Sequence, residues 1–356
     1  MEKKNIQSKR VRIKDIARLA NVSTGTVDRV IHKREGVSEE SKKKVEEIIK
    51  LLNYQPNMYA SALASNKKYN FICLLPTHSH GEYWTDIEIG IQSAVDFYVD
   101  FNISAKIVYY NQYQYDSFIS QYNEVLKEEP DGVVFAPTNP TYTLAFTKEL
   151  EKLDIPYIYL DFNIEGTKPL AFYGQDSSQS GLFAAKMLML LANDNKELVV
   201  FRHINKGIVG SNQQEYREIG FRRYMEKLHP DCIIHELNLL ANEEIKNTEL
   251  LNNFFNKNPQ VHVGIVFNSK AYLIAEYFEK VNKKDFNFIG YDLLARNISC
   301  LKKGTVNFLI AQQPRHQGYN SIEALCNFLI LKKEVNRINY MPIDLLSKET
   351  IDYYKH

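Results

Sequence analysis

Short apolar runs alternate with helix-like stretches after Asn70, and this alternation constrains the fold of the chain more than any other feature. The runs that read as buried strands are FICLLP, AKIVYY, GVVFAP, IPYIYLD, ELVVFRH, CIIHEL, HVGIVFN, FNFIGYD and VNFLIAQ. Between them lie stretches with helical periodicity, such as EIGIQSAVDFYVDF, FISQYNEVL, GLFAAKMLMLLA, GFRRYMEKL and AYLIAEYFEKV. Alternating strands and helices predict a mostly parallel, doubly wound sheet. The strands are too many for one such sheet, so we expect two lobes, although we find no internal sequence repeat.

Charge is distributed unevenly along the chain, although its total is close to zero. The first 68 of the 356 residues hold 16 Lys and Arg against 8 Asp and Glu, whereas the remainder holds 28 against 35. A basic first module on an acidic body indicates that the first part meets a polyanion, and a solvated basic tail is the alternative. Hydrophobic residues make up 44% and charged residues 24%, as is typical of a globular protein.

Cysteine spacing and the first residues of the chain bear on its compartment. Cys73, Cys232, Cys300 and Cys326 are scattered without CxxC or Cys/His spacing, which argues against a disulfide framework and against a zinc site. The opening residues MEKKNIQSKRVRIKD contain no apolar stretch of a secretion signal, and no run of about 18 apolar residues occurs. We therefore expect a cytoplasmic protein with no metal, no cofactor and no membrane span.

Residues 13–54 predict three helices. The apolar positions place the first helix over about 14–20, and Ser23 is suited to cap a second helix that runs to about His32. Ser38 is suited to cap the third, whose apolar stripe can close a small core: Val45, Ile48, Ile49 and Leu52. Two short helices with a tight turn are typical of a helix-turn-helix, whose second helix enters the DNA major groove. Any apolar helix pair gives the same pattern, so this signal alone is only moderately specific.

The residues of this module resemble the DNA-binding head of the LacI (lactose repressor) family. The resemblance rests on RIKDIARLANVSTGTVDRVI, GVSEESKKKVEEIIKLLNYQPN and ASALAS, which match without gaps over residues 12–65. It implies a helix-turn-helix domain over 1–54 and a hinge helix or linker over 55–68. In that family the hinge folds in the DNA minor groove and inserts a leucine, here Leu63, between base steps. The chain departs from the family at Ser61, where an arginine is common.

The resemblance also assigns DNA contacts to single residues. The predicted set is Ser23, Thr24, Gly25, Thr26, Asp28, Arg29, Tyr54, Asn57, Ala60 and Leu63. Arg29 could bind guanine O6 and N7 or form a surface salt bridge, and Thr24 could meet a thymine methyl group or cap the helix. Gly25 either lets the backbone approach the groove or leaves one base unread. Asp28 could accept from cytosine N4, or hold Arg29 or Arg18 in position.

The chain from Phe71 to about Tyr354 resembles the sugar-binding, type I periplasmic-binding-protein-like domain of the same family. The resemblance implies two α/β lobes joined by crossovers, with a small molecule in the cleft between them. Such sheets bind ligands at the carboxyl ends of their strands on general grounds too. The predicted effector site combines residues at such strand ends with residues that the resemblance assigns, Arg217 among them. The full set is Tyr83, Trp84, Asn139, Asp161, Gln175, Asp176, Arg217, Asn268, Asp292 and Gln312.

Some of these residues have a second interpretation. Tyr83 could be a core aromatic at a helix start, and Asp176 could cap the helix that follows it. Related proteins place the ligand arginine either at Arg217 or at the position of Glu215. Together the set supplies carboxylates, amides, one guanidinium and aromatic rings. That chemistry suits a monosaccharide or sugar acid better than a purine or a peptide.

The sequence therefore predicts an α/β protein with an all-α helix-turn-helix head, a hinge helix, and a two-lobed doubly wound parallel-sheet effector domain over 69–356. We expect a homodimeric transcriptional regulator that binds pseudo-palindromic double-stranded operator DNA, a repressor that its effector releases, with a sugar-responsive activator as the alternative. A sugar-active enzyme fused to the head would need a phosphate loop or a catalytic motif. The sequence contains no GxxxxGK[ST], GxSxG or HExxH. The basic head and the lack of an export signal argue against a transport binding protein.

Overall fold

The computed structural model describes residues 11–31, 34–52, 54, 59, 67–137, 139–193, 195–205, 207–209, 211–240 and 243–354. The chain divides into two compact units, Met1–Ser65 and Asn66–His356. Asn57, Ala60 and Leu63 of the predicted hinge lie outside the described residues, as does most of the predicted hinge helix. No described helix is both long and apolar enough to cross a membrane.

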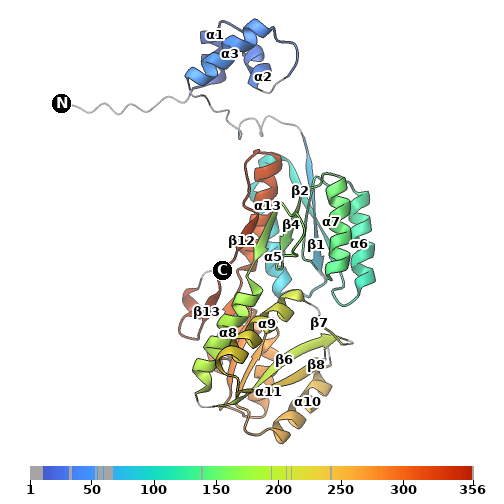
Figure 1. Cartoon of the computed structure of the whole chain (residues 1–356), viewed down its shortest axis with the longest axis vertical. Coiled ribbons are helices and arrows are strands. Elements are labelled where there is room, and N and C mark those ends of the chain that lie inside the picture. Colours follow the sequence, from blue (N-terminus) through green and yellow to red (C-terminus); the bar gives the residue numbers. More distant parts are fainter. Residues whose placement is uncertain are drawn as a thin grey trace, which may run out of the picture. The chain divides into compact units, whose positions relative to one another are not determined.

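Three helices form the described part of the first unit (Figure 1): α1 (Ile13–Ala20), α2 (Thr24–Ile31) and α3 (Glu39–Leu51). α1 ends at Asn21, whose left-handed backbone (φ 53°) turns the chain toward α2. The Ser38 side chain caps α3 by accepting a backbone N–H bond, as the sequence predicts. Ile16, Val27 and Val45 come from the three helices in turn and are fully buried, so the predicted small core is confirmed.

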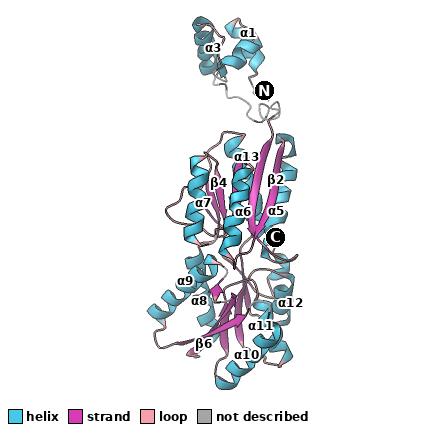
Figure 2. Cartoon of the chain, turned by 90° about the vertical axis from the view of Figure 1, so that its right-hand side faces the viewer, coloured by secondary structure: helices cyan, strands magenta, loops and turns pink. Residues whose placement is uncertain are grey.

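The first sheet of the second unit has six parallel strands in the order β12-β5-β4-β3-β1-β2. The strands are β1 (Tyr69–Pro76), β2 (Ile103–Tyr110), β3 (Gly132–Phe135), β4 (Tyr157–Leu160), β5 (Ala171–Gly174) and β12 (Ile338–Tyr340). One face is covered by α6 (Tyr115–Lys127) and α7 (Pro140–Lys152), and the other by α5 (Tyr83–Phe97) and α13 (Pro314–Leu329). Figure 2 shows helices on both sides of these strands. Because both faces are covered, β3 to β5 are buried along their whole length.

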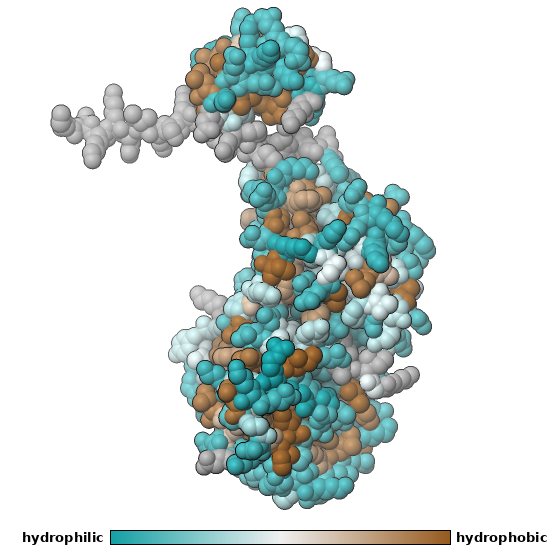
Figure 3. All heavy atoms as spheres, in the orientation of Figure 1, coloured by the Kyte–Doolittle hydropathy of each residue, from teal (hydrophilic) through white to brown (hydrophobic). Residues whose placement is uncertain are grey.

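The second sheet has seven strands in the order β13-β11-β10-β9-β6-β7, and β8 pairs with β6. The strands are β6 (Glu197–Asn205), β7 (Ile208–Val209), β8 (Ile233–Leu240), β9 (Val263–Val266), β10 (Asn287–Tyr291), β11 (Phe308–Ala311) and β13 (Asp344–Leu346). One face packs against α8 (Ser177–Ala192) and α9 (Asn212–Leu228), and the other against α10 (Glu244–Lys257), α11 (Ala271–Lys280) and α12 (Ala295–Lys303). Of the described pairings, only β7 and β13 run antiparallel to their neighbours. On the face that Figure 3 presents, apolar residues lie in separate patches among hydrophilic ones, as is normal for a protein surface.

The chain passes between the two lobes at three places in the described residues: 175–176 after β5, 312–313 after β11, and 341–343 between β12 and β13. The lobes share one strand order, since β5-β4-β3-β1-β2 in the first corresponds to β11-β10-β9-β6-β8 in the second. The predicted two-lobed α/β body with mostly parallel sheets is therefore confirmed. Every apolar run predicted as a strand contains one.

The structure differs from the sequence prediction at short elements and at helix boundaries, since α9 begins at Asn212 rather than at Gly220, the first residue of GFRRYMEKL. β5, β7, β12 and β13 were not among the predicted runs. β7, β12 and β13 have only two or three residues, too few to show a pattern, whereas β5 has four, as do the predicted strands β3, β4, β9 and β11. The helix predicted from residue 88 to residue 101 begins earlier, at Tyr83, and its last part forms a separate 3-10 turn, Val99–Phe101.

Candidate functional site

A polar cavity of about 120 Å³ lies between the two lobes at the carboxyl ends of their strands. We call it the interlobe cleft. Its lining residues are Thr77, His78, Glu82, Tyr83, Trp84, Gln112, Tyr113, Asp161, His203, Ser211, Gln213, Gln214, Arg217, Phe267, Asn268, Ser269, Lys270, Asp292 and Gln312. Of the residues predicted to bind an effector, the structure brings together here Tyr83, Trp84, Asp161, Arg217, Asn268, Asp292 and Gln312.

Two buried carboxylates face the interlobe cleft from opposite lobes. Asp161 follows β4 and Asp292 follows β10, and both have a left-handed backbone, with φ of 70° and 69°. They are 7% and 5% exposed. Burial raises the pKa of both carboxyl groups, that of Asp292 to about 6, while the positive charge of Arg217 opposes the rise. The cleft therefore holds two acids whose ionisation depends on what lies beside them.

Arg217 is a buried cation of the interlobe cleft, which Lys270 also lines. It lies on α9 and is 1% exposed. Its Nη1 donates to the Phe267 carbonyl at 2.8 Å, and its guanidinium carbon lies 4.0 Å from the ring centroid of Tyr291. Its Nε and Nη2 are buried and have no hydrogen-bond partner among the described residues. A buried charged donor without a partner is costly, so these N–H groups are suited to a ligand that supplies acceptors.

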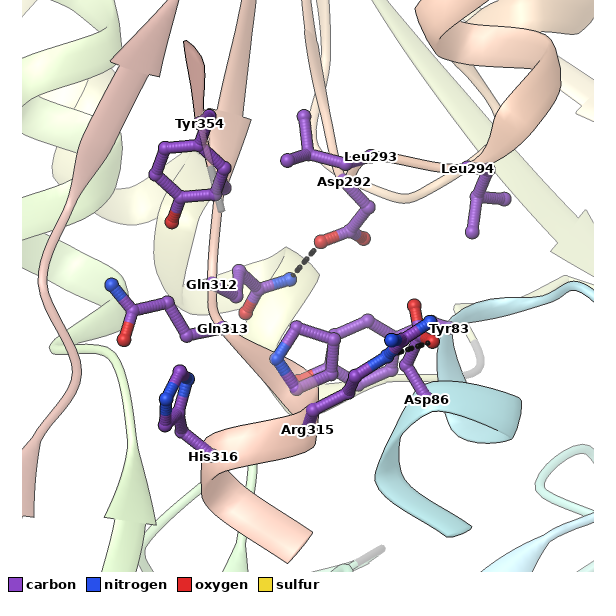
Figure 4. Close-up of a pocket in the computed structure, with 12 residues that line it drawn as sticks. Tyr83, Asp86, Asp292, Leu293, Leu294, Gln312, Gln313, Arg315, His316 and Tyr354 are labelled. Atoms are coloured by element: carbon purple, nitrogen blue, oxygen red, sulfur yellow. Dashed lines mark hydrogen bonds and ion pairs between the residues drawn. The ribbon is translucent and has the colours of Figure 1, made fainter. Parts of the chain in front are cut away.

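Hydrogen bonds between side chains join the two carboxylates across the cleft. Asp161 Oδ1 accepts from the Tyr83 hydroxyl at 3.1 Å and from Gln213 Nε2 at 2.6 Å. Gln213 Nε2 also donates to Gln312 Oε1 at 2.6 Å, and Gln312 Nε2 donates to Asp292 Oδ1 at 2.6 Å. Figure 4 shows this last bond from the adjoining small cavity, where Asp292 and Gln312 point toward each other. The network orients both acids and connects the lobes directly.

His203 is a cleft residue that the sequence analysis missed. It lies near the end of β6 and is 4% exposed. Burial, and after it the positive charge of Lys270, lowers the pKa of His203 to about 3, so the ring is neutral. Asn268 Nδ2 lies 3.0 Å from His203 Nδ1, and because an amide nitrogen can only donate, Nδ1 accepts and the proton of the neutral ring is on Nε2. That Nε2 is buried without a partner among the described residues, so it offers the cleft a further donor.

The sequence contains a recognisable pattern for some of the cleft residues that were not predicted and none for others. His203 closes the apolar run ELVVFRH, and the rule that strand ends carry ligand contacts would have found it. Gln213 and Gln214 lie one helical turn before Arg217, so they share its face of α9. Lys270 and Tyr113 lie in loops, and only the folded chain places them at the cleft.

Asn139, Gln175 and Asp176 were predicted as effector contacts, but they do not line the interlobe cleft. Asn139 caps α7, since its Oδ1 accepts from the Thr141 N–H at 2.9 Å. Asp176 caps α8 by accepting from the Gln179 N–H at 2.9 Å, which is its alternative role in the sequence analysis. Gln175 is 2% exposed and bonds to backbone carbonyls of the crossovers. We therefore leave these three residues out of the site.

The exposed side of α2 in the first unit carries the residues predicted to read DNA. Ser23 Oγ accepts from the Thr26 N–H at 3.0 Å and so fixes the start of the helix. Thr24, Gly25 and Arg29 are exposed. A Cβ added at Gly25 would meet only the Ser23 hydroxyl, at 3.7 Å, so this part of the helix is open to a close approach.

Asp28 makes a different contact from those considered in the sequence analysis. Its carboxylate pairs with Arg34 at 3.3 Å rather than with Arg29 or Arg18. Both side chains are largely exposed, so the pair adds little stability but neutralises an acid on the predicted DNA-facing helix. Tyr54 packs against the core of the head.

Among the described residues, no group of three His, Cys, Asp or Glu side chains could hold a metal ion.

Comparison with known proteins gives two family matches. Residues 12–57 match the model described as bacterial regulatory proteins, lacI family, and residues 71–333 match the periplasmic binding protein domain. The chain is 31% identical to catabolite control protein A of Priestia megaterium over 179 residues, which is 50% of this chain and 52% of that protein, so the match spans about half of that relative. It is 25% identical to the HTH-type transcriptional repressor PurR of Vibrio cholerae over 95% of this chain and 97% of that one.

Solved structures extend the comparison. A protein from Bacteroides fragilis described as a LacI transcriptional regulator is 58% identical, with a TM-score of 0.80, over 81% of this chain and 100% of that one. A solute-binding protein from Burkholderia graminis in complex with D-arabinose is 14% identical, with a TM-score of 0.72, over 82% of this chain and 100% of that one. The second likeness shows the fold alone.

Proposed function

The chain belongs to the lacI family of bacterial regulatory proteins and carries a periplasmic binding protein domain, and we propose that it is a DNA-binding transcriptional repressor controlled by a small carbohydrate. One observation supports the control most directly. The interlobe cleft combines two buried carboxylates with buried N–H donors of Arg217 and His203 that have no partner among the described residues. A site of this kind is arranged to bind a small polar molecule.

The hydrogen-bonding groups of the cleft favour a polyhydroxylated ligand. Asp161 and Asp292 accept hydrogen bonds, and Arg217 and His203 donate them. A sugar hydroxyl can do both at once, so a ring with several hydroxyl groups satisfies both sets. Trp84 and Tyr83 lie edge to face, with ring centroids 5.1 Å apart, and supply an aromatic surface for the apolar face of a sugar ring. We therefore propose a monosaccharide or sugar acid as the effector.

The proposed DNA contacts come from α2 and from the hinge. Arg29 and Thr24 would read base edges, while Ser23 and Thr26 would hold phosphates. Asn57, Ala60 and Leu63 stay predictions from the sequence, with Leu63 as the wedge in the minor groove. We propose that the protein acts in the cytoplasm as a homodimer, because two-fold symmetry matches the half-sites of a pseudo-palindromic operator.

Effector binding would control DNA affinity by closing the two lobes on each other. The Gln213–Asp161 bond and the Gln312–Asp292 bond already join groups that a ligand would contact from both lobes. A ligand that bonds to both carboxylates favours one interlobe arrangement, and the operator favours one arrangement of the lobes through the hinge. We propose that the effector favours the arrangement that releases DNA.

The test uses an operator selected by the full-length chain from a library of random duplexes. Fluorescence anisotropy then measures the affinity for that duplex with pentoses, hexoses and uronic acids added singly. We expect one of these sugars to weaken operator binding and to raise the melting temperature of the protein. A variant that lacks residues 1–68 should lose operator binding and keep the sugar-dependent rise in melting temperature. Absence of any sugar effect on both measurements would contradict the proposal, and a sugar that strengthens operator binding would support the activator instead.

A further inference from the structure

Gln175 lies where the three interlobe crossovers meet. It belongs to the first crossover, directly after β5, and is 2% exposed. Its Nε2 donates to the carbonyl of Ala311, the last residue before the second crossover, at 2.7 Å. The same Nε2 donates to the carbonyl of Pro342, in the third crossover, at 2.6 Å. The amide of Gln175 thus uses both of its hydrogens to connect the first crossover to the start of the second and to the third.

The oxygen of the same amide connects this junction to the interlobe cleft. Gln175 Oε1 accepts from the Ser180 hydroxyl at 3.2 Å, and Ser180 Oγ lies 3.0 Å from the Tyr291 hydroxyl. Because Ser180 donates to Gln175, the Tyr291 hydroxyl donates to Ser180. Burial raises the pKa of Tyr291, which keeps that hydroxyl protonated. The face of the Tyr291 ring packs against the Arg217 guanidinium at 4.0 Å.

These contacts are buried, so the groups that make them cannot readily exchange their hydrogen-bond partners for water. Gln175, Ser180, Tyr291 and Arg217 are each at most 2% exposed. The Ala311 and Pro342 carbonyls need donors, and a carboxylate or a hydrocarbon at residue 175 cannot supply two N–H groups. A movement of Arg217 upon ligand binding would therefore shift the crossovers through the hydroxyl groups of Tyr291 and Ser180 and the amide of Gln175.

We propose that Gln175 is a positioning residue of the interlobe hinge, which couples the state of the cleft to the relative movement of the lobes. The claim that Gln175 transmits effector binding to the head rests on the proposed function. The claim that Gln175 holds the crossovers together concerns the protein without ligand and does not depend on it. Gln175 touches no ligand in this account. Its loss should spare the affinity of the cleft for its effector and weaken the transmission of that binding to the DNA-binding head.

The first experiment needs no ligand. Hydrogen exchange by mass spectrometry is compared for the full-length chain and the Gln175→Met variant, which keeps the length of the side chain and removes its hydrogen bonds. The Met341 N–H, which bonds to the Gly174 carbonyl at 2.9 Å, lies in the third crossover. We expect exchange there to quicken by about tenfold or more. Gln179→Met makes the same chemical change at an exposed position on α8 and should leave that exchange unaltered.

The second experiment measures coupling, as the ratio of operator Kd values with and without D-glucose, D-arabinose or D-glucuronate, whichever shifts the melting temperature. In Gln175→Met we expect this ratio to fall by about tenfold while the sugar Kd changes by less than about threefold. Tyr291→Phe keeps the ring beside Arg217 and removes the hydroxyl, so it should lower the ratio without altering exchange at Met341.

The outcomes separate the two proposals. Unchanged exchange at Met341 in a folded Gln175→Met protein would overturn the hinge role, whatever the sugars do. Faster exchange with an unchanged coupling ratio would overturn the regulatory part alone. If none of the three sugars shifts the melting temperature or the operator Kd, the choice of effector class fails, and the exchange measurement still decides whether Gln175 holds the hinge.

Discussion

The two lobes share one strand order, but residues at corresponding positions make different hydrogen bonds. Gln175 follows β5 in the first lobe, and Gln312 follows β11 at the corresponding strand of the second. Each is followed six residues later by a glycine on the next helix, Gly181 and Gly318. Yet Gln312 bonds to the Asp292 carboxylate in the interlobe cleft, whereas Gln175 bonds to crossover carbonyls. The same residue at the same place in the fold thus lines the interlobe cleft in one case and joins the interlobe crossovers in the other.

The helix pair α8 and α9 of the second lobe corresponds to the pair α13 and α5 of the first, and the residues at their close contacts also differ. Gly181 of α8 lies against the backbone of Arg217 on α9, and Gly318 of α13 lies against the backbone of Ile87 on α5. The second lobe thus places a buried cation where the first places an aliphatic side chain. The carboxylates, in contrast, are matched, since Asp161 and Asp292 follow corresponding strands with nearly equal φ. The comparison indicates that the second lobe supplies most of the charge that holds a ligand, and the first adds an acid and aromatic rings.

The largest expected effect comes from removing the cation that only the second lobe has. Arg217→Met should lower effector affinity by about 100-fold or more, because it removes the buried Nε and Nη2 donors that have no partner among the described residues and are suited to the ligand. Isothermal titration with the sugar that the proposed screen selects measures the loss. Arg223→Met, at an exposed position of the same helix, is the matched control and should bind normally. Equal affinity in Arg217→Met and Arg223→Met would remove Arg217 from the site.

The next prediction compares how closely the two helix pairs pack, measured by the stability lost when each contact glycine is replaced by alanine. A Cβ at Gly181 would lie 1.8 Å from the Arg217 carbonyl oxygen, and one at Gly318 would lie 2.1 Å from that of Ile87. Gly181→Ala and Gly318→Ala should therefore each lower the free energy of unfolding by about 2–3 kcal/mol, as overpacking does. Urea unfolding gives the values, and Ser178→Ala serves as a control on α8. A neutral effect in either lobe would show that its helix pair can separate.

The pH dependence of effector binding tests the role of Asp292 and should be the smallest of these effects. The ionised form of Asp292 accepts sugar hydroxyls best, and its pKa is raised by burial to about 6. Effector affinity should thus rise, by up to about tenfold, as the pH increases through about 6. The sign for stability is opposite: the folded state holds this proton more tightly than the unfolded state, so stability falls as the pH rises from about 4 to 6. Both changes should diminish in Asp292→Asn, measured by titration and by thermal unfolding. A pH profile identical to that of the unaltered protein would contradict the assignment.

Much of the fold follows from the sequence, and the site follows where strand ends decide it. Asp161, Asn268 and Asp292 come directly after buried apolar runs, and in parallel sheets these positions meet at one edge. Gln175 satisfies the same rule, but the crossover that begins there turns its side chain inward to the hinge. Nothing in the local sequence separates it from Gln312, since only the order in which the chain passes between the lobes makes the difference.

The internal symmetry shows the same limit. No repeat is evident in the sequence, although the two lobes share one strand order. Parallel sheets of this kind need buried apolar strands and close helix packing, which many sequences provide, so the architecture repeats without the residues. His203 lies at a strand end and was open to prediction, whereas Lys270 reaches the cleft from a loop whose position only the folded chain defines.

We propose that a carbohydrate in the interlobe cleft controls the affinity of the head for operator DNA. The most direct test measures operator Kd by fluorescence anisotropy for the full-length chain and for Arg217→Met, with and without the identified sugar. We expect equal operator affinity for both proteins without sugar, about tenfold or greater weakening by sugar in the unaltered chain, and no response in Arg217→Met at the same concentration. An unaltered sugar response in Arg217→Met would show that the cleft does not control operator binding through this residue.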